Sequence, residues 1–319
     1  MEKSRIICAD AVEGLKQIAD NTVRTCITSP PYYGLRDYGM DGQIGIEPTP
    51  EAFIERLVAV FREVKRVLKD DGTLWVNISD SYATHASASK EYSHNFRQAD
   101  VAADNGIGTM KKPTAHSMGL KEKDMIGIPW MLAFALRADG WYLRSDIIWR
   151  KTNGLPEPVK DRPAKGYEHI FLLAKSHKYF YDADAVKQPC CAETMARYGR
   201  AHSTSNKHAL FTTQPINSKS TESISEDRKT KNMKDVWDIP TNSYRVDAHF
   251  AMFPEKLVEP CILAGSEVGD FVLDPFFGSG TTGAVAKRLG RKYIGVELNP
   301  EYAKLAQQRI DSAPFYSKV

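Results

Sequence analysis

Residues 270–300 read "DFVLDPFFGSGTTGAVAKRLGRKYIGVELNP", and this stretch decides the fold. An apolar run is followed by a glycine-containing turn, by helix-forming residues closed by Gly290, and by a second apolar run that reaches Glu297. This order predicts a strand, a turn, a helix and a second strand. The turn after the first strand then lies at the carboxyl edge of the sheet, where open α/β sheets bind ligands.

The turn carries residues that suit a nucleoside ligand. Gly278 and Gly280 allow the backbone to approach a ligand closely, and Glu297 can accept hydrogen bonds from ribose hydroxyls. The turn does not match the dinucleotide fingerprint G-x-G-x-x-G, so a mononucleoside cofactor is favoured. Glycines that only tighten and pack a turn are the competing interpretation.

The rest of the chain continues the alternation of strands and helices, so a mixed α/β fold is predicted. Strands are expected over 5–10 and 23–28, joined by a helix over 11–18. If these strands are parallel neighbours, Asp10 and Ser29 lie side by side at the carboxyl edge. A helix is expected over 50–68, with Thr49 as its cap and Pro50 at its first position, because apolar residues recur at helical spacing: Phe53, Leu57, Phe61, Val64 and Leu68. Further strands are expected over 70–78, 141–149 and 168–176, and further helices over 129–140 and 299–310.

Two segments break the alternation. Residues 83–123 are rich in Ser, Ala, His, Asn and Lys and lack a clear period, which is typical of a long loop or insertion. Residues 184–245 are also irregular, and between Val186 and Val236 nine Lys or Arg stand against five Asp or Glu. The second segment is therefore locally basic.

Composition limits the class of protein without identifying a function. Apolar residues make up 42% and charged residues 26% of the 319 residues, which is typical of a soluble globular protein. No apolar run approaches the roughly 20 residues that span a bilayer, and the first residues do not resemble a signal peptide. Five irregularly spaced cysteines fit reduced thiols. We expect a cytoplasmic protein without a membrane partner, and the net charge of +3 leaves nucleic-acid binding open.

A second motif, "TSPPYY" at 28–33, follows the strand predicted over 23–28. "SPPY" at 29–32 and "DPFFGSGTT" at 274–282 together resemble the amino-group DNA methyltransferases that use S-adenosylmethionine. In that family the first is the catalytic motif and the second the cofactor loop. Here the catalytic motif comes first in the chain, which resembles the permuted arrangement called the β class.

The resemblance covers most of the chain and implies a Rossmann-like mixed sheet of seven strands, with a circularly permuted order of motifs. It implies that residues 1–183 form the catalytic half of the methyltransferase domain and residues 246–319 the cofactor-binding half. Residues 184–245 would be an inserted DNA-recognition region. The loop over 83–123 would be a further insertion.

The resemblance also implies roles in catalysis. The Ser29 hydroxyl and the Pro30 carbonyl would accept hydrogen bonds from the amino group of a base flipped out of double-stranded DNA. Tyr32 would stack on that base, and Pro31 would stiffen the turn between them. Because the methyl group leaves a sulfonium, direct transfer needs positioning and no covalent protein intermediate.

Further residues would bind the cofactor. Asp10 would accept a hydrogen bond from the cofactor's adenine amino group, and capping the following helix is its alternative role. Phe253 belongs to a segment that closes over the cofactor in the family, with hydrophobic packing as the competing account. The complete set of expected cofactor-binding residues is Asp10, Phe253, Asp274, Pro275, Phe276, Gly278, Ser279, Gly280, Thr281, Thr282 and Glu297.

The target base is predicted from the first residue of the catalytic motif. Within the family "SPPY" accompanies methylation of cytosine N4 more often, whereas "DPPY" is commoner for adenine N6. We therefore predict an N4-cytosine methyltransferase, with N6-adenine as the alternative. Double-stranded DNA is the expected partner, and the resemblance is compatible with a homodimer and with a cognate restriction endonuclease.

Other interpretations of the sequence remain. A C5-cytosine methyltransferase needs a nucleophilic cysteine, and Cys190 follows a proline, although it lies in the irregular basic segment. Cys190, Cys191, His202 and His208 lack the spacing of a zinc site, so no metal is expected. An RNA or protein methyltransferase would share the sheet. A non-catalytic DNA-binding module would be expected to lose Ser29 or the glycines, and both are present.

Overall fold

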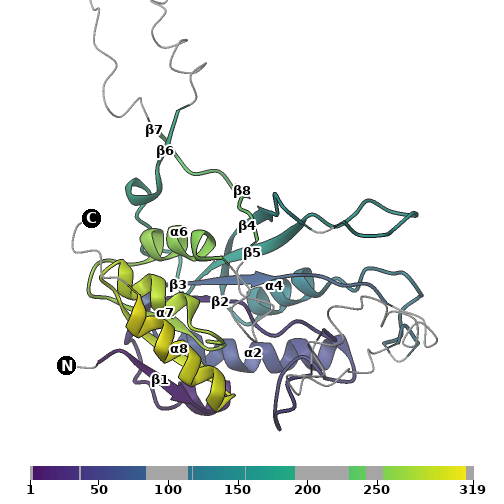
Figure 1. The fold of residues 1–319 in the computed structure, drawn as a ribbon, viewed down its shortest axis with the longest axis horizontal. Coiled ribbons are helices and arrows are strands. Elements are labelled where there is room, and N and C mark those ends of the chain that lie inside the picture. The colour runs from purple at the N-terminus through teal and green to yellow at the C-terminus, as the bar shows by residue number, and fades with distance from the viewer. Residues whose placement is uncertain are drawn as a thin grey trace, which may run out of the picture. The chain divides into compact units, whose positions relative to one another are not determined.

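The main feature of the computed structural model is a sheet of eight strands in the order β1-β10-β9-β2-β3-β5-β4-β8 (Figure 1). The structure describes residues 3–35, 37–83, 114–116, 118–154, 156–190, 230–241 and 254–313. The strands of the sheet are β1 Arg5–Cys8, β2 Val23–Thr28, β3 Leu68–Ile78, β4 Tyr142–Arg150, β5 Tyr167–Ala174, β8 Val236–Asp238, β9 Phe271–Asp274 and β10 Lys292–Glu297. Strand β5 runs antiparallel to its neighbours β3 and β4, and the other pairings in the sheet are parallel.

Strands β9 and β10, which come late in the chain, lie in the interior of the sheet. They are inserted between β1 and β2, because β1 pairs with β10 and β2 pairs with β9. The prediction that Asp10 and Ser29 follow neighbouring strands is therefore wrong. Strands that are consecutive in the sequence usually pair with each other. Here β9 and β10, from the last part of the sequence, lie between β1 and β2 instead.

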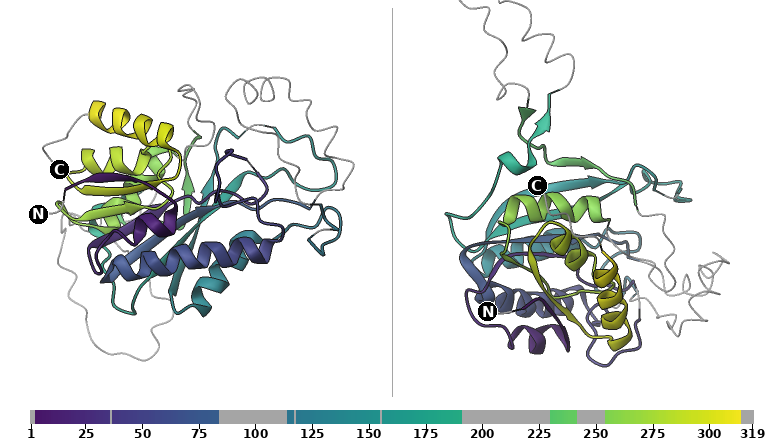
Figure 2. Two further views of the ribbon diagram at one scale, coloured as in Figure 1. Left: turned by 90° about the horizontal axis from the view of Figure 1, so that it is seen from below. Right: turned by 60° about the vertical axis from the view of Figure 1, so that its left-hand side comes forward.

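Six helices among the described residues cover the two faces of the sheet. They are α1 Ala11–Leu15, α2 Pro50–Val67, α4 Ile128–Ala138, α6 Glu255–Gly265, α7 Thr281–Arg288 and α8 Pro300–Ser312. Helix α2 packs against α1 and α4 on one face, while α7 packs against α6 and α8 on the other (Figure 2). The carboxyl edge of the sheet lies between these two layers.

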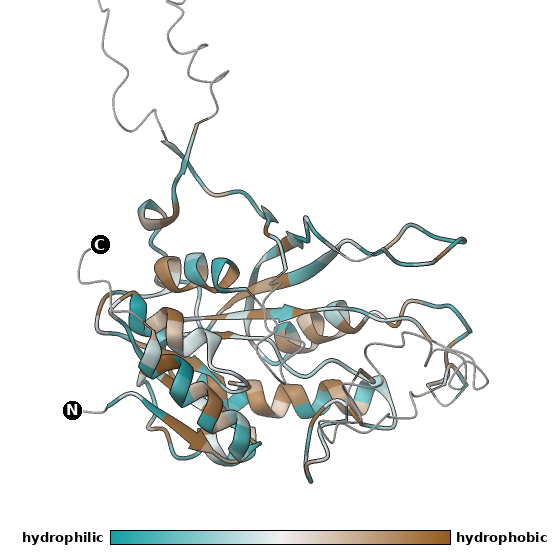
Figure 3. Ribbon diagram, viewed as in Figure 1, coloured by the Kyte–Doolittle hydropathy of each residue, from teal (hydrophilic) through white to brown (hydrophobic). Residues whose placement is uncertain are grey.

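Helix α2 shows how the sequence produces one of these layers. The Thr49 hydroxyl accepts a hydrogen bond from the Ala52 amide (3.2 Å), and Pro50 occupies the first turn, as its sequence predicted. The apolar side chains expected at helical spacing are all 0% exposed: Phe53, Leu57, Phe61, Val64 and Leu68. Figure 3 shows the corresponding alternation of hydrophobic and hydrophilic residues along α2. Helix α1 is shorter than the predicted helix over 11–18.

The chain divides into two compact units, residues 1–182 with 235–319, and residues 183–234. In the smaller unit the structure describes a short 3-10 helix, Asp184–Val186, and an antiparallel pair formed by β6 Gln188–Pro189 and β7 Thr230–Lys231. Strand β8 falls within the predicted recognition region 184–245 but belongs to the larger unit. It pairs with β4. The resemblance implied a sheet of seven strands, and β8 is the eighth strand of the observed sheet.

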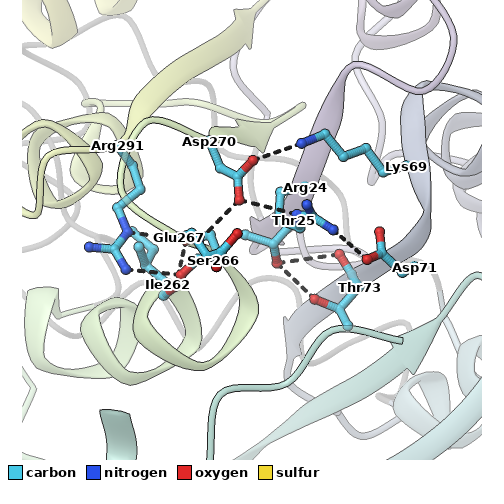
Figure 4. Close-up of polar contacts among 10 residues, drawn as sticks. All are labelled: Arg24, Thr25, Lys69, Asp71, Thr73, Ile262, Ser266, Glu267, Asp270 and Arg291. Carbon is cyan, nitrogen blue, oxygen red and sulfur yellow. Dashed lines mark hydrogen bonds and ion pairs between the residues drawn. The ribbon is translucent and has the colours of Figure 1, made fainter. Parts of the chain in front are cut away.

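A polar network at the amino ends of the strands keeps them in register, at the edge opposite the predicted site. The Asp270 carboxylate accepts hydrogen bonds from Arg24 Nε (3.1 Å), Lys69 Nζ (2.7 Å) and the Glu267 amide (3.0 Å). Figure 4 shows Arg24 reaching from Asp270 to Asp71, so that side chains beside β2, β3 and β9 are joined. Burial opposes ionisation of Asp270, but these donors outweigh it and lower its pKa.

Candidate active site

Asp274, the last residue of β9, connects the two sequence motifs. Its Oδ1 accepts hydrogen bonds from Thr28 Oγ1 (2.7 Å) and the Phe276 amide (3.0 Å), and its Oδ2 accepts one from Thr282 Oγ1 (2.8 Å). Thr28 directly precedes Ser29, so the SPPY motif and the glycine turn begin side by side at the carboxyl edge. Asp274 is 1% exposed, and its burial raises the carboxyl pKa to about 6 against the opposing effect of the two threonine hydroxyls.

The two glycines of the turn differ in their surroundings. Gly278 and Gly280 have φ values of +50° and +76°, in the region that favours glycine. A Cβ atom at Gly280 would lie 2.9 Å from the Cβ of Ala306 in α8, so packing excludes a side chain there. A Cβ atom at Gly278 would meet no heavy atom within 4 Å. Gly280 therefore serves packing, whereas Gly278 faces open space.

Glu297 lies beside this open space. Its Oε2 accepts a hydrogen bond from the Gly278 amide (2.7 Å), and its Oε1 accepts one from the Asn299 amide (2.9 Å). Burial raises the pKa of the carboxyl group. The predicted ribose acceptor and the predicted glycine turn thus meet at the ends of β9 and β10.

Asp10 lies near Glu297 instead of near Ser29. It follows β1, whose last residue Cys8 pairs with Glu297 in the neighbouring strand β10. Its Oδ1 accepts hydrogen bonds from the amides of Val12 (2.9 Å) and Glu13 (3.4 Å), so it caps helix α1. The capping role is therefore present, and contact with an adenine amino group stays a prediction.

The remaining predicted cofactor residues are distributed differently. Arg309 of α8 donates hydrogen bonds to the hydroxyls of Thr281 (2.9 Å) and Ser279 (3.3 Å), and a second of its nitrogens pairs with Glu255 (2.8 Å). With Thr282 bonded to Asp274, these hydroxyls hold the start of α7 in place. Pro275 and Phe276 form the turn itself, and Phe276 packs against the core. Phe253 lies outside the described residues.

The two tyrosines of "TSPPYY" have different environments. Tyr33 is 4% exposed and its ring packs against Phe53 with centroids 5.3 Å apart, so it belongs to the core. Tyr32 is half-buried, and its hydroxyl donates a hydrogen bond to Glu168 Oε2 (2.5 Å). Burial, and then the neighbouring Glu168 carboxylate, raises the pKa of Tyr32, while a hydrogen bond with Ser29 acts in the opposite direction. Both tyrosines border a cavity, but only the Tyr32 hydroxyl bonds the Glu168 carboxylate among the contacts that the structure describes.

Comparison with known proteins supports the resemblance that the two motifs, SPPY and the glycine turn, suggested. Residues 23–308 match the N6/N4 family model described as DNA methylase. The chain belongs to this family. It is 43% identical over 309 residues to the type II methyltransferase M.XycI of Xanthomonas campestris pv. cyanopsidis, covering 96% of this chain and 87% of the relative. It is 44% identical over 301 residues to the type II methyltransferase M.Cfr9I of Citrobacter freundii, covering 94% and 85%.

Solved structures show that the methyltransferase shares its fold with other DNA methyltransferases. The PvuII DNA methyltransferase, described as cytosine-N4-specific, matches with a TM-score of 0.63 at 19% identity, covering 97% of this chain and 86% of that one. A protein from Thermus thermophilus, solved with S-adenosyl-L-methionine, matches with a TM-score of 0.59 at 24% identity, covering 98% and 96%. The chain is a β-class amino DNA methyltransferase with a permuted order of motifs.

The methyl donor of this methyltransferase is S-adenosylmethionine. The turn fits such a molecule, because Gly278 leaves space beside the backbone and Glu297 offers carboxylate oxygens next to it. The hydrogen bond from the Gly278 amide holds the Glu297 carboxylate beside this space. The individual contacts of Asp10, Glu297 and the turn with the cofactor stay predictions.

Three polar residues near Tyr32 were missed by the sequence reasoning. Asn77 at the end of β3 donates a hydrogen bond to Glu168 Oε2 (3.1 Å), and Lys151 pairs with Glu168 Oε1. Glu168 is 6% exposed. The sequence signal that could have revealed Glu168 is the only carboxylate in "YEHIFLLA", a strand whose last five residues are all apolar.

A cavity of about 240 Å³ opens beside the same group. Its walls include Tyr32, Glu168 and residues 79–82, which follow β3. Apolar side chains such as Ile128 line another part of it. A cavity with an aromatic wall and a few polar groups is suited to a flat, polar ligand.

The alternative chemistry proposed for cysteine receives no support from the described residues. Cys190 follows β6 in the smaller unit, half-buried, and Cys191, His202 and His208 lie outside the described residues. Within the described ranges no group of three or more His, Cys, Asp and Glu side chains is arranged to hold a metal ion. Over those same ranges no helix is long and apolar enough to cross a membrane.

We expect Glu297→Ala to weaken S-adenosylmethionine binding by about 10-fold or more, since it removes the carboxylate beside the open face of Gly278. Calorimetric titration with the cofactor measures this. Glu301→Ala, which removes an exposed carboxylate in the first turn of α8, is the matched control and should bind as the parent does. Unchanged affinity in a folded Glu297 variant would remove this residue from the cofactor site.

Proposed function

We propose that the protein methylates the exocyclic N4 of cytosine in double-stranded DNA at a specific sequence. The observation that carries the proposal is the serine at the first position of the catalytic motif, placed directly after β2 and one residue from the Thr28–Asp274 hydrogen bond. The family favours serine at this position for cytosine and aspartate for adenine.

The residues of the chain are suited to direct transfer. S-adenosylmethionine supplies a methyl group on a sulfonium, which needs no further activation by the protein. Ser29 and the Pro30 carbonyl accept hydrogen bonds from the amino group of the flipped base, which orients its nitrogen and favours lone-pair density there. Tyr32 stacks on the base and replaces the stacking lost from the duplex.

The product of the reaction tests this proposal. Duplex DNA incubated with the enzyme and cofactor, digested to nucleosides and examined by mass spectrometry, is expected to contain N4-methylcytosine. N6-methyladenine would correct the base while leaving the mechanism intact. The variant Cys190→Ser should keep full turnover, because no thiolate attack is involved; 5-methylcytosine lost in that variant would overturn the mechanism.

We also propose that residues 184–245 recognise the DNA sequence. Their basic, irregular composition suits contacts to phosphates and bases on a rigid support, and binding should weaken as salt rises. Exchanging this segment for that of a related enzyme is expected to transfer the methylated site, read out by sequencing of modified DNA. A chimera that keeps the parent's site would place recognition elsewhere, with the loop over 83–123 as the next candidate.

The cellular setting is proposed from the same relationship. M.XycI and M.Cfr9I are named type II methyltransferases, so we propose that this enzyme protects DNA from a cognate restriction endonuclease in the cytoplasm. A homodimer is a further proposal, and sedimentation of the purified protein at several concentrations tests it.

A further inference from the structure

We propose that Glu168 is a positioning residue that fixes the Tyr32 ring for the flipped base. The inference rests on the proposed stacking role of Tyr32 and adds a residue outside both sequence motifs. Glu168 lies in β5, on the antiparallel side of the sheet, whereas Tyr32 follows β2. A side chain of β5 would therefore fix the orientation of a ring that follows β2.

The contacts of Glu168 converge on Tyr32. One carboxylate oxygen, Oε2, accepts hydrogen bonds from Tyr32 Oη (2.5 Å) and Asn77 Nδ2 (3.1 Å). The other oxygen pairs with Lys151. Asn77 is itself fixed by a second hydrogen bond, from its Nδ2 to the His169 carbonyl (3.2 Å). Asn77 Oδ1 offers the Tyr32 hydroxyl a longer contact (3.4 Å), so Glu168 is the nearer of these two acceptors. Glu168 is held by Asn77 of β3 and by Lys151, which directly follows β4.

Burying a carboxylate at this position of β5 costs free energy, and the strand could form with an apolar residue there. Residues on the same face of the strand are Ile170 and Leu172, which are 1% and 5% exposed, so an apolar side chain would fit the pattern. Burying Glu168 is unfavourable unless its oxygens are paired, and a buried ion pair is weak evidence for stability. Its hydrogen bonds with Tyr32 and Asn77 and its ion pair with Lys151 offset this cost.

The Tyr32 ring needs such an anchor. The prolines at 30 and 31 stiffen the backbone before it but leave the side-chain torsions free. The hydroxyl contact at 2.5 Å restricts those torsions, and the ring then forms a fixed wall of the cavity that Glu168 also lines. A wall ordered in advance lowers the entropy lost when a base is captured.

The competing account is that Glu168 only neutralises Lys151 and supports the sheet. A double-mutant cycle separates the two accounts, because residues that act through one hydrogen bond give non-additive losses. The cycle consists of Tyr32→Phe, Glu168→Leu and the double variant, with single-turnover methylation and cofactor affinity measured for each. Thermal unfolding reports whether each variant is folded.

We expect Tyr32→Phe to lower the single-turnover rate by roughly 10-fold, because a small misplacement of reacting groups costs at least this much. Glu168→Leu should cost about the same, the double variant no more than either, and cofactor affinity should not change. The proposal would be overturned if the double variant lost the product of the two single effects, roughly 100-fold in rate. It would also be overturned if Tyr32→Phe methylated DNA as fast as the parent.

Glu168→Gln keeps the test valid if the leucine variant does not fold. Glutamine retains an acceptor for the Tyr32 hydroxyl and removes the charge that Lys151 neutralises. A rate within about threefold of the parent supports positioning. A loss as large as that of Tyr32→Phe would assign the effect to the charge and contradict the proposal.

Asp146→Ala is the matched control for general loosening of this part of the sheet. Asp146 in β4 contacts His169 (2.8 Å), the residue after Glu168, on the opposite face of the sheet. Its effect should multiply with that of Tyr32→Phe. If the parent enzyme produces N6-methyladenine, the proposed base is wrong, whereas the coupling between Tyr32 and Glu168 is decided by the cycle alone.

Discussion

Replacing Ser29 with alanine is expected to lower kcat by about 10²-fold while leaving S-adenosylmethionine affinity unchanged. In the proposed mechanism the hydroxyl accepts a hydrogen bond from the amino group of the target base, and loss of one oriented hydrogen bond in a transition state typically costs on the order of 10²-fold or more. The cofactor turn should keep its geometry, because the Thr28–Asp274 hydrogen bond does not involve Ser29.

Single-turnover methylation with saturating DNA measures this effect, and calorimetry measures cofactor binding. Ser176→Ala is a suitable control, since that hydroxyl bonds only the Lys178 carbonyl in an exposed turn among the contacts that the structure describes. A Ser29→Ala enzyme that is folded and as fast as the parent would remove the hydroxyl from the mechanism.

Asp274→Ala is expected to lower the free energy of unfolding by about 3 kcal/mol or more and to weaken cofactor binding strongly. The change leaves the buried hydroxyls of Thr28 and Thr282 and the Phe276 amide without their acceptor, and each such group typically costs about 1–3 kcal/mol. Denaturant unfolding measures the first effect and calorimetry the second.

Asp270→Ala is the control for Asp274→Ala. Asp270 directly precedes the first residue of β9, whereas Asp274 is its last residue. The Asp270 variant loses contacts to Arg24 and Lys69, so it should also be destabilised. Its cofactor affinity should stay close to that of the parent. Equal loss of affinity in both variants would mean that Asp274 acts only through general stability.

The pKa of Asp274 gives stability a dependence on pH. A folded-state pKa of about 6 lies above the roughly 3.9 of an unfolded aspartate, so the protonated group stabilises the fold at low pH. This contribution is lost as pH rises between about 4 and 6. Asp274→Asn stays neutral, so the stability of the parent relative to this variant should fall between pH 4 and pH 7, as denaturant unfolding at the two pH values measures.

Much of the fold follows from local patterns in the sequence. The spacing of apolar residues predicted helix α2 with its Thr49 cap, and the glycine turn follows β9 while Glu297 ends β10, as expected. These features are local, because helix periodicity, capping and turn chemistry depend on residues a few positions apart.

The order of strands and the surroundings of Tyr32 could not be predicted in the same way. The insertion of β9 and β10 between β1 and β2 depends on pairing between distant segments, and pairing of consecutive strands was the simplest expectation. Glu168 is more than a hundred residues from Tyr32 in the chain, and no local pattern links a carboxylate in β5 to a loop after β2. Such contacts form only when the sheet is assembled.

The pairing of Arg5 with Ile294 has a consequence for biosynthesis. When the first half of the chain has left the ribosome, β1 and β2 are both present, but the two strands that belong between them have not been made. In a nascent chain β10, the strand with which β1 pairs, is therefore still missing, and long-range parallel pairing of this kind forms slowly. We expect a newly made molecule to become active only after β9 and β10 have been synthesised and have paired with β1 and β2.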